Sequence, residues 1–235
     1  MIHPESYIAQ SVKELPQKLP IFPLEGVLLL PGGQLPLNVF EKHYLRMVED
    51  ALSDSRLIGI IQPSTKRDKP SDQSEGHSEL DIFDTGCAGR ITSFSETSDG
   101  RYEVVLTGVC RFQINQVLEK TKGYRRVEAK WDSFTEDLNQ NQRQCLNIDR
   151  DKLYALLDNF FEMHDLSCSW DSIKATPDSS LITALSMICP LAPSEKQCLL
   201  EAEDCEKRAE MFMTMLELAT HQKGLDTQGS SDQQH

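Results

Sequence analysis

The sequence lacks the short motifs that mark the commonest enzyme classes. It contains no GxxxxGK[ST] phosphate loop and no GxGxxG turn, so it lacks the signature motifs of P-loop nucleotide hydrolases and of dinucleotide-binding proteins. GxSxG, HExxH and SxxK are also absent, which argues against α/β-hydrolases, zinc proteases and serine–lysine enzymes of the β-lactamase type. We therefore expect a protein that is not an enzyme, with no catalytic residue, no metal site and no cofactor.

Long apolar runs are missing as well. The longest uninterrupted one, residues 27–30, is far shorter than the roughly 20 residues that a membrane-spanning helix needs. The amino-terminal residues, MIHPESYIAQSVKEL, have no basic start followed by an apolar core, the pattern of a secretory signal. We expect no membrane association and a cytoplasmic location.

The seven cysteines form no CxxC pair and are widely spaced, which resembles neither a disulfide framework nor a zinc site. We expect buried, reduced thiols. Cys87, between Gly86 and Gly89, has an alternative role as the nucleophile of a cysteine hydrolase, which requires an exposed thiol with a basic partner. His43 is either a general base or ligand, or a surface histidine near a helix start, and we favour the surface residue.

Acidic residues outnumber basic ones, and the excess is concentrated in the second half of the chain. The net charge is −13; residues 1–130 contribute −2 and residues 131–235 contribute −11. Because nucleic-acid affinity is built largely from basic contacts, this balance argues against general nucleic-acid binding.

Residues 19–52 are apolar, interrupted by prolines, and then helical in pattern. Prolines at positions 20, 23, 31 and 36 are too close together for a helix, so the intervening pieces are predicted to be short strands. From Glu41 onward, apolar residues recur at three- and four-residue spacing, which predicts a helix.

The chain up to about residue 135 has the pattern of a small β-barrel. Residues 57–62 predict a buried strand, residues 63–79 a polar surface loop, and residues 85–96 a strand with a bend or bulge permitted by glycine. The turn TSDG at 97–100 leads into a returning strand, which Thr107 and Gly108 are expected to break. In all we expect seven or eight short strands and one helix, enough for a nearly closed barrel.

A helical pattern follows a Gln/Asn-rich link at residues 139–147. We predict helices over 153–163, over 181–188 with a stop at Pro190, and over 194–221 with a capping box from Ser194 to Gln197. The predicted organisation is an extension at 1–18, a barrel at 19–135, a helical part at 136–222 and a disordered tail at 223–235. The fold class is α+β.

One basic cluster lies in residues 120–131. Lys120, Lys122, Arg125, Arg126 and Lys130 are interleaved with Tyr124 and Trp131. Arginines beside stacking aromatics hold single-stranded RNA in many modules, whereas a solvated edge strand gives the same composition. We favour the edge strand and keep RNA binding as the alternative.

The segment LPIFPLEGVLLLPGGQLPLNVFEKHYLRMVEDAL resembles the opening of the amino-terminal, substrate-binding domain of the ATP-dependent protease Lon. Similar matches follow in order: IGIIQ at 58–62, GCAGRI at 86–91, DGRYEVVLTGVCRFQI at 99–114 and PLAPSEKQCLLEAEDCEKR at 190–208. The resemblance covers residues 19–222, without the ATPase or Ser-Lys protease module, so the chain looks like a stand-alone member.

The resemblance implies a PUA-like β-barrel with one inserted helix, followed by a helical bundle. It also implies an adaptor that recognises unfolded or apolar polypeptide segments and works with a protease or chaperone. We assign Pro31, Leu35, Leu37 and Phe40, in the apolar run before the helix, as the candidate polypeptide-binding residues.

Overall fold

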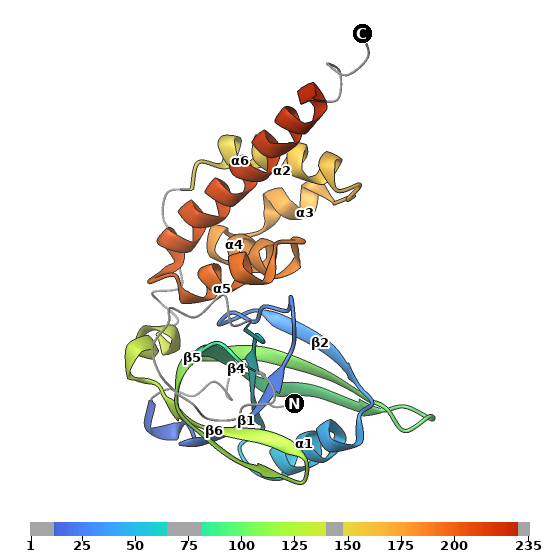
Figure 1. Cartoon of the computed structure of the whole chain (residues 1–235), viewed down its shortest axis with the longest axis vertical. Coiled ribbons are helices and arrows are strands. Elements are labelled where there is room, and N and C mark those ends of the chain that lie inside the picture. The colour runs from blue at the N-terminus through green and yellow to red at the C-terminus, as the bar shows by residue number, and fades with distance from the viewer. Residues whose placement is uncertain (1–11, 65–80, 140–147, 230–235) are drawn as a thin grey trace. The chain divides into compact units, whose positions relative to one another are not determined.

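A computed structural model of the chain describes residues 12–64, 81–139 and 148–229, without the side chains of 221–229 (Figure 1). The chain divides into two compact units. The first contains residues 1–143 and 187–201, and the second contains residues 144–186 and 202–235. The predicted loop at 63–79, link at 139–147 and amino-terminal extension fall mostly outside the described residues. The disordered tail predicted at 223–235 is wrong for residues 223–229, which are helical, and residues 230–235 lie outside the described residues. The predicted domain boundaries stay predictions.

Six strands form the sheet of the first unit. They are β1 (Lys18–Pro23), β2 (Gln34–Val39), β3 (Leu57–Ile61), β4 (Thr85–Glu96), β5 (Tyr102–Thr121) and β6 (Tyr124–Lys130). The strand order is β2-β5-β4-β3-β1-β6, and β5 also pairs with β6. This extra pairing closes five strands into a barrel and leaves β2 attached to β5 alone. The α+β class and the small barrel are therefore confirmed.

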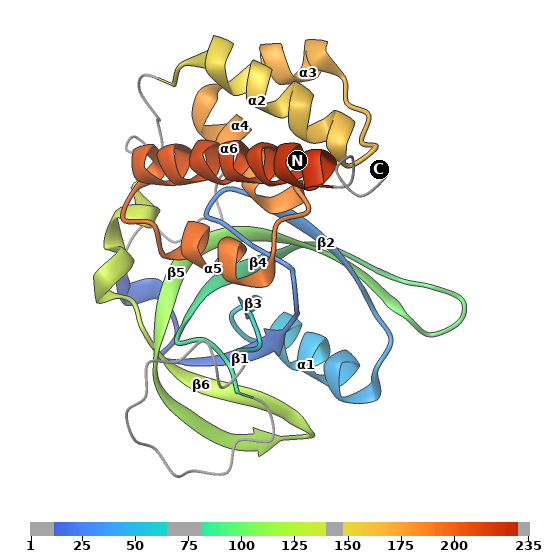
Figure 2. The same cartoon turned by 45° about the horizontal axis from the view of Figure 1, so that its top comes forward.

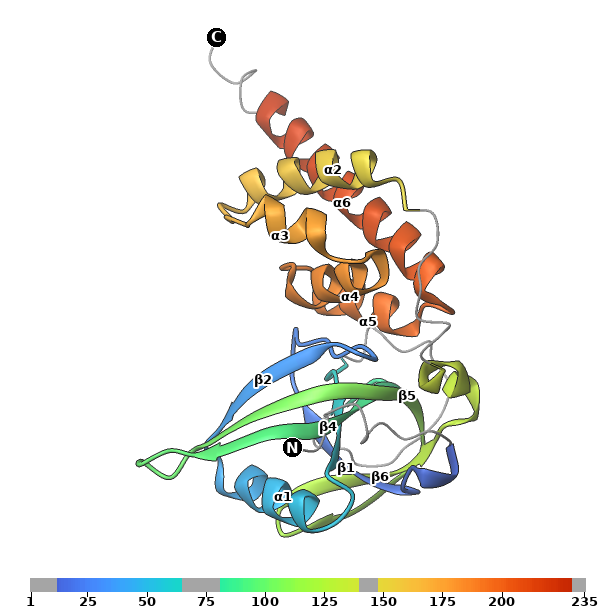
Figure 3. The same ribbon diagram turned by 180° about the vertical axis from the view of Figure 1, so that it is seen from behind.

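One helix, α1 (Lys42–Ser53), is inserted between β2 and β3, as predicted, and packs beside β1, β3 and β6 (Figure 3). Its buried residues Met47, Val48 and Ala51 follow the expected helical spacing. The barrel core contains fully buried side chains from β1, β3 and β5, including Leu19, Ile58 and Phe112.

The strand β5 continues past Thr107 and Gly108 (Figure 2), so the predicted break is limited to a register shift of the β4–β5 ladder between Gly108 and Cys110. Gly108 has a different role, because the segment before β2 crosses β5 at this point. The Gly108 N–H donates to the carbonyl of Gly33, and the Gly32 N–H donates to the carbonyl of Gly108, both at 2.8 Å. A Cβ at Gly108 would lie 2.0 Å from the Leu30 carbonyl oxygen, so only glycine allows this approach.

The ladder between β4 and β5 contains two register shifts, between Ala88 and Gly89 and between Ile91 and Ser93. The extra residue is Val109 of β5 at the first shift and Thr92 of β4 at the second, so the bulge of β4 lies at Thr92 and not at the glycines from which it was predicted. The second changes which side chains share a face: Ile91 pairs with Leu106 and Phe94 pairs with Val104. Since Leu106 and Val104 are two residues apart on β5, Ile91 and Phe94 lie on one face although they are three residues apart.

Helix α5 (Pro193–Glu201) belongs to the barrel unit. Gln62 donates to the Pro193 carbonyl (2.8 Å), Gln197 to the Thr85 carbonyl (3.2 Å) and Lys196 to the Gly26 carbonyl (2.9 Å). The predicted capping box is wrong, because the Gln197 side chain reaches β4. The carboxylate of Glu195 instead accepts from the backbone N–H of Ala192 at 2.7 Å.

The long predicted helix at 194–221 is two helices, α5 and α6 (Cys205–Gly229). They separate at residues 202–204, where the Asp204 carboxylate caps α6 by accepting from the Lys207 N–H at 2.7 Å. The helix α6 extends past the predicted end near His221 because one interior glycine, Gly224, costs only about 1 kcal/mol.

The second unit contains α2 (Arg150–Met163), α3 (Trp170–Ala175), most of α4 (Asp178–Ile188) and α6. The predicted helices at 153–163 and 181–188 are confirmed, and the short α3 was not predicted. Arg150 of α2 donates to Asp178 at the start of α4 (2.7 Å) and to the carbonyl of Thr176 just before it (2.8 Å), and within α2 it donates to the Tyr154 hydroxyl (2.9 Å). In the described part of the chain, no helix is long and apolar enough to cross a membrane.

Candidate functional site

The four predicted binding residues lie in and around β2. Pro31 is half-buried in the turn before the strand, and Leu35 and Leu37 are half-buried within it. Phe40, directly after the strand, has 66% of its surface exposed. Large aromatic side chains stabilise a fold mainly by burial, so an exposed phenylalanine that follows a strand with half-buried leucines marks apolar surface that the fold leaves open.

The register of β2 on β5 shows which face the leucines share. Leu35 pairs with Leu106, and Leu37 pairs with Val104. Both partners are buried, at 0% and 2% exposure, and directly opposed residues lie on the same face of a sheet. The apolar inner face of the sheet therefore continues outward from buried β5 to the half-exposed leucines of β2.

Phe94 extends this surface and was missed from the sequence. It is 41% exposed and contacts the ring of Tyr102 edge-on, with 5.0 Å between centroids. Val104 on β5 pairs with Phe94 of β4 on one side and with Leu37 of β2 on the other. Its neighbours Ser93 and Ser95 made it look like an isolated residue on a polar strand. The bulge after Ile91 is the feature that returns Phe94 to the apolar face.

The outer edge of β2 is poorly suited to pairing with another strand. The Gly108 N–H donates to the carbonyl of Gly33, and hydrogen-bonded pairs recur every second residue in an antiparallel ladder. The backbone N–H and C=O groups of Leu35 and Leu37 therefore point toward β5. The backbone of Pro36 points to the free edge of β2, where proline offers no N–H to another strand. Among the described residues, no strand pairs with this edge. The surface thus presents side chains rather than a continuous backbone ladder.

The catalytic alternatives are not supported by the positions of their residues. Cys87 is fully buried, with 0% exposure, which ends the cysteine hydrolase hypothesis. His43 stays partly exposed near the start of α1, 3.7 Å from the Glu41 carboxylate, and its ring contacts that of Tyr44 in a tilted arrangement with 4.0 Å between centroids. The described residues contain no group of three or more side chains that could hold a metal ion.

The cysteines only partly match the expectation of buried, reduced thiols. Cys87, Cys110 and Cys189 are buried, and burial raises the pKa of the Cys189 thiol to about 12. Cys168 and Cys198 are free but exposed, and Cys205 is disulfide-bonded. The prediction is wrong for these three.

The basic cluster lies on the hairpin formed by β5 and β6, and its aromatic residues point inward. Tyr124 and Trp131 are each 5% exposed. The Tyr124 hydroxyl donates to Asp50 on α1 (2.9 Å), and the Trp131 indole N–H donates to the Pro16 carbonyl (3.1 Å). Because neither ring is available for stacking, the proposed RNA-binding platform is absent from this hairpin.

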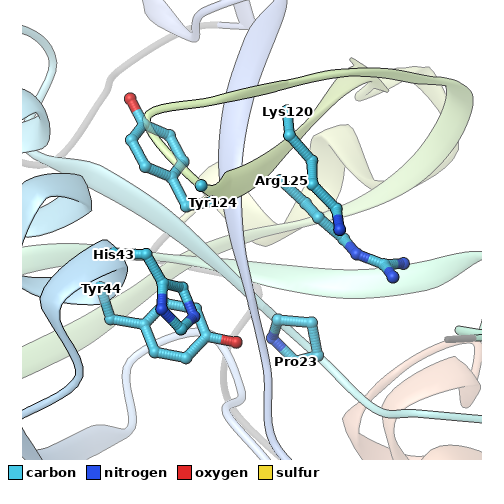
Figure 4. Close-up of a pocket in the computed structure, with 7 residues that line it drawn as sticks. Pro23, His43, Tyr44, Lys120, Tyr124 and Arg125 are labelled. Carbon is cyan, nitrogen blue, oxygen red and sulfur yellow. The ribbon is translucent and has the colours of Figure 1, made fainter. Parts of the chain in front are cut away.

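Two cations of the cluster line a pocket of about 290 Å³ at one end of the barrel (Figure 4). Its lining residues are Pro23, His43, Tyr44, Lys120, Gly123, Tyr124 and Arg125. Burial, and then the nearby carboxylate of Glu41, raise the pKa of Tyr44, while Arg125 acts in the opposite direction. The other cations lie elsewhere; Lys122, for example, pairs with Asp50.

Several known proteins share this sequence pattern. The chain is 24% identical over 205 residues to "Lon protease 2" of Myxococcus xanthus, which covers 87% of this chain and 24% of that protein. It is 25% identical over 218 residues to a Lon protease of Flavobacterium johnsoniae, covering 89% and 25%. The chain therefore spans about a quarter of the length of these relatives.

Solved structures share the fold. A Lon N-terminal domain protein from Xanthomonas campestris superposes with a TM-score of 0.53 and 22% identity, covering 85% of this chain and 98% of that one. The N-terminal domain of a Mycobacterium avium complex Lon protease gives 0.55 and 17%, with the same coverage. The family model of the substrate-binding domain of ATP-dependent protease La (LON) matches residues 18–217, and the chain belongs to this family.

Proposed function

We propose that this protein is a non-enzymatic adaptor that binds unfolded or apolar polypeptide segments. Membership in the Lon substrate-binding family supports substrate recognition as the general role. The proposal includes action in the cytoplasm beside a protease or chaperone that processes the bound polypeptide.

The observation that carries the proposal is the exposure of Phe40 directly after the strand that contains the half-buried Leu35 and Leu37. Together with Pro31, these residues form the proposed contact surface, and Phe94 adds a further aromatic side chain on the same sheet face as Leu37. Covering one such side chain with apolar polypeptide contributes about 1.5–3 kcal/mol. Sequence-tolerant binding of unfolded chains requires this kind of contact, because it is non-directional.

The test measures binding of a fluorescently labelled, reduced and carboxymethylated protein that cannot fold, by anisotropy. We expect wild-type protein to bind it and Phe40→Ala to weaken binding about ten-fold or more, since the lost apolar contact is of the order of 2 kcal/mol. The Phe40 side chain contributes little to the fold because it is mostly exposed, so the variant should unfold at the wild-type urea concentration.

The matched control is Leu218→Ala, which removes an exposed apolar side chain (59%) from α6. It should bind as wild type does. Equal binding by Phe40→Ala and Leu218→Ala would contradict the proposed surface, and no binding by the wild type would contradict polypeptide recognition itself.

A further inference from the structure

The apolar surface proposed to bind polypeptide ends at an acidic residue of β4. On β5, Tyr102 lies two residues before Val104 and therefore on the same face of the strand. Tyr102 pairs with Val39 of β2 on one side and with Glu96 of β4 on the other. Since directly opposed residues share a face, Glu96 lies one row beyond Phe94 on the same surface. The hairpin of β4 and β5 that carries this row projects past the end of β2 (Figure 2).

Two aromatic rings lie beside Glu96. The rings of Phe94 and Tyr102 meet edge-on, with 5.0 Å between their centroids. The Tyr102 hydroxyl donates to the carboxylate of Glu49 on α1 at 2.8 Å, so the ring is tied to the helix. Phe94 keeps 41% of its surface exposed. An aromatic face attracts a cation that lies within about 6 Å of the ring centre, because the ring quadrupole is negative there.

Two carboxylates add negative charge to the aromatic pair. Glu49 and Glu96 are exposed, and no lysine or arginine of the described residues forms an ion pair with either of them. Arg101, next to Tyr102 in the sequence, pairs with Asp99 instead, at 2.7 Å. The hydrogen bond to Glu49, then burial and the charges of both carboxylates raise the pKa of Tyr102. We call Phe94, Tyr102, Glu49 and Glu96 the aromatic–acidic edge.

We propose that the aromatic–acidic edge binds the cationic side chain of a lysine or arginine in the bound polypeptide, so that the protein selects apolar segments that carry a basic residue. The inference rests on the proposed polypeptide binding at β2 and names its substrate class. Alternate residues of a strand are about 7 Å apart, which is the spacing of Phe94 and Glu96 and also of alternate residues in an extended ligand. One short segment can therefore place an apolar side chain at Leu37 and Phe94 and a basic one at Glu96.

The test compares three fluorescent peptides by anisotropy at a salt concentration of about 0.15 M, which screens distant charges. The peptides share an apolar centre of leucine and phenylalanine and differ only in the flanking residues, which are lysine, glutamine or glutamate. We expect the wild type to bind the lysine peptide about five-fold more tightly than the glutamine peptide, as one cation–π contact and one exposed ion pair would give. The glutamate peptide should bind most weakly.

Variants then locate the preference. Glu96→Gln should reduce it to about two-fold or less and leave the affinity for the glutamine peptide unchanged. Phe94→Leu keeps an apolar side chain but removes the ring, so it should reduce the preference in the same way. The matched control is Glu103→Gln, because Glu103 is exposed on the same hairpin but pairs with Ser95 on the other face of the sheet. It changes the net charge as Glu96→Gln does and should keep the five-fold preference.

Equal affinity of the wild type for the lysine and glutamine peptides would overturn this inference and leave the proposed function standing, because both peptides would bind. Equal loss of the preference in Glu96→Gln and Glu103→Gln would also overturn it, because net charge rather than the aromatic–acidic edge would then explain the selection. Absence of binding by all three peptides would overturn polypeptide recognition, and this inference with it.

Discussion

Arg111 is a charged side chain with only 3% exposure inside the barrel unit. Its guanidinium donates to both carboxylate oxygens of Asp137 at 2.9 Å and to the Leu200 carbonyl at 3.0 Å, and it lies 4.3 Å over the ring of Phe134. Arg111 lies between the buried Cys110 and Phe112 on β5, so its side chain points to the other face of the strand. It is buried there because residues 132–138 and α5 cover this face.

Replacing Asp137 by Asn should lower the free energy of unfolding by about 3–5 kcal/mol, because it leaves a buried guanidinium without its counter-charge. Urea unfolding followed by Trp131 fluorescence, in a Trp170→Phe background, reports the barrel unit alone. Asp99→Asn is the control, since Asp99 and its partner Arg101 are both about half exposed, and it should leave the midpoint unchanged. Equal midpoints for the two variants would contradict a structural role for the buried pair.

The contact between α1 and the β5–β6 hairpin depends on pH through Tyr124. Burial, and then the hydrogen bond to Asp50, raise the pKa of Tyr124 to about 12. An unfolded tyrosine has a pKa near 10, so the folded state holds the proton more tightly. The stabilisation is therefore complete below about pH 10 and is lost as the pH rises from 10 toward 12.

We expect the phenolate absorbance that Tyr124→Phe removes to titrate near pH 12, and to titrate nearer 10 in Asp50→Asn. Unfolding experiments across the same range should show a steeper fall in stability for the wild type than for Tyr124→Phe. A Tyr124 component that titrates near 10 in the wild type would show that the contact with Asp50 does not form.

At the scale of elements, local chemistry in the sequence predicted much of the fold. Proline spacing located β1 and β2, the turn TSDG located the β4–β5 hairpin, and apolar spacing located α1. What failed depended on distant contacts: Gly108 looked like a strand break because the crossing segment at 30–33 was invisible, and Gln197 looked like a cap because its true partner is in β4. The pocket was missed for the same reason, since its walls come from four separate segments.

At the scale of the whole molecule, the barrel unit is discontinuous in sequence. The chain leaves it after residue 143 and returns at 187–201, so that α5 completes a unit begun at the amino terminus. Polar groups of the barrel form hydrogen bonds with α5: the carbonyls of Gly26 and Thr85 accept from Lys196 and Gln197, and Arg111 donates to the Leu200 carbonyl. The first 143 residues contain all strands of the barrel but lack the helix α5 that completes the barrel unit.

A chain that ends after residue 143 should therefore form a less stable barrel than the full-length protein. Each of these three hydrogen bonds contributes about 0.5–1.5 kcal/mol, so their loss should lower the free energy of unfolding by about 1.5–4.5 kcal/mol. The truncated chain contains Trp131 alone, and full-length Trp170→Phe does too, so urea unfolding by fluorescence compares the same probe. In the full chain, Gln197→Ala should reproduce part of the loss, and Glu206→Ala on α6 should not. Equal midpoints for truncated and full-length proteins would mean that α5 contributes nothing to the barrel, because burial of its leucines and its polar contacts would then have no measurable effect.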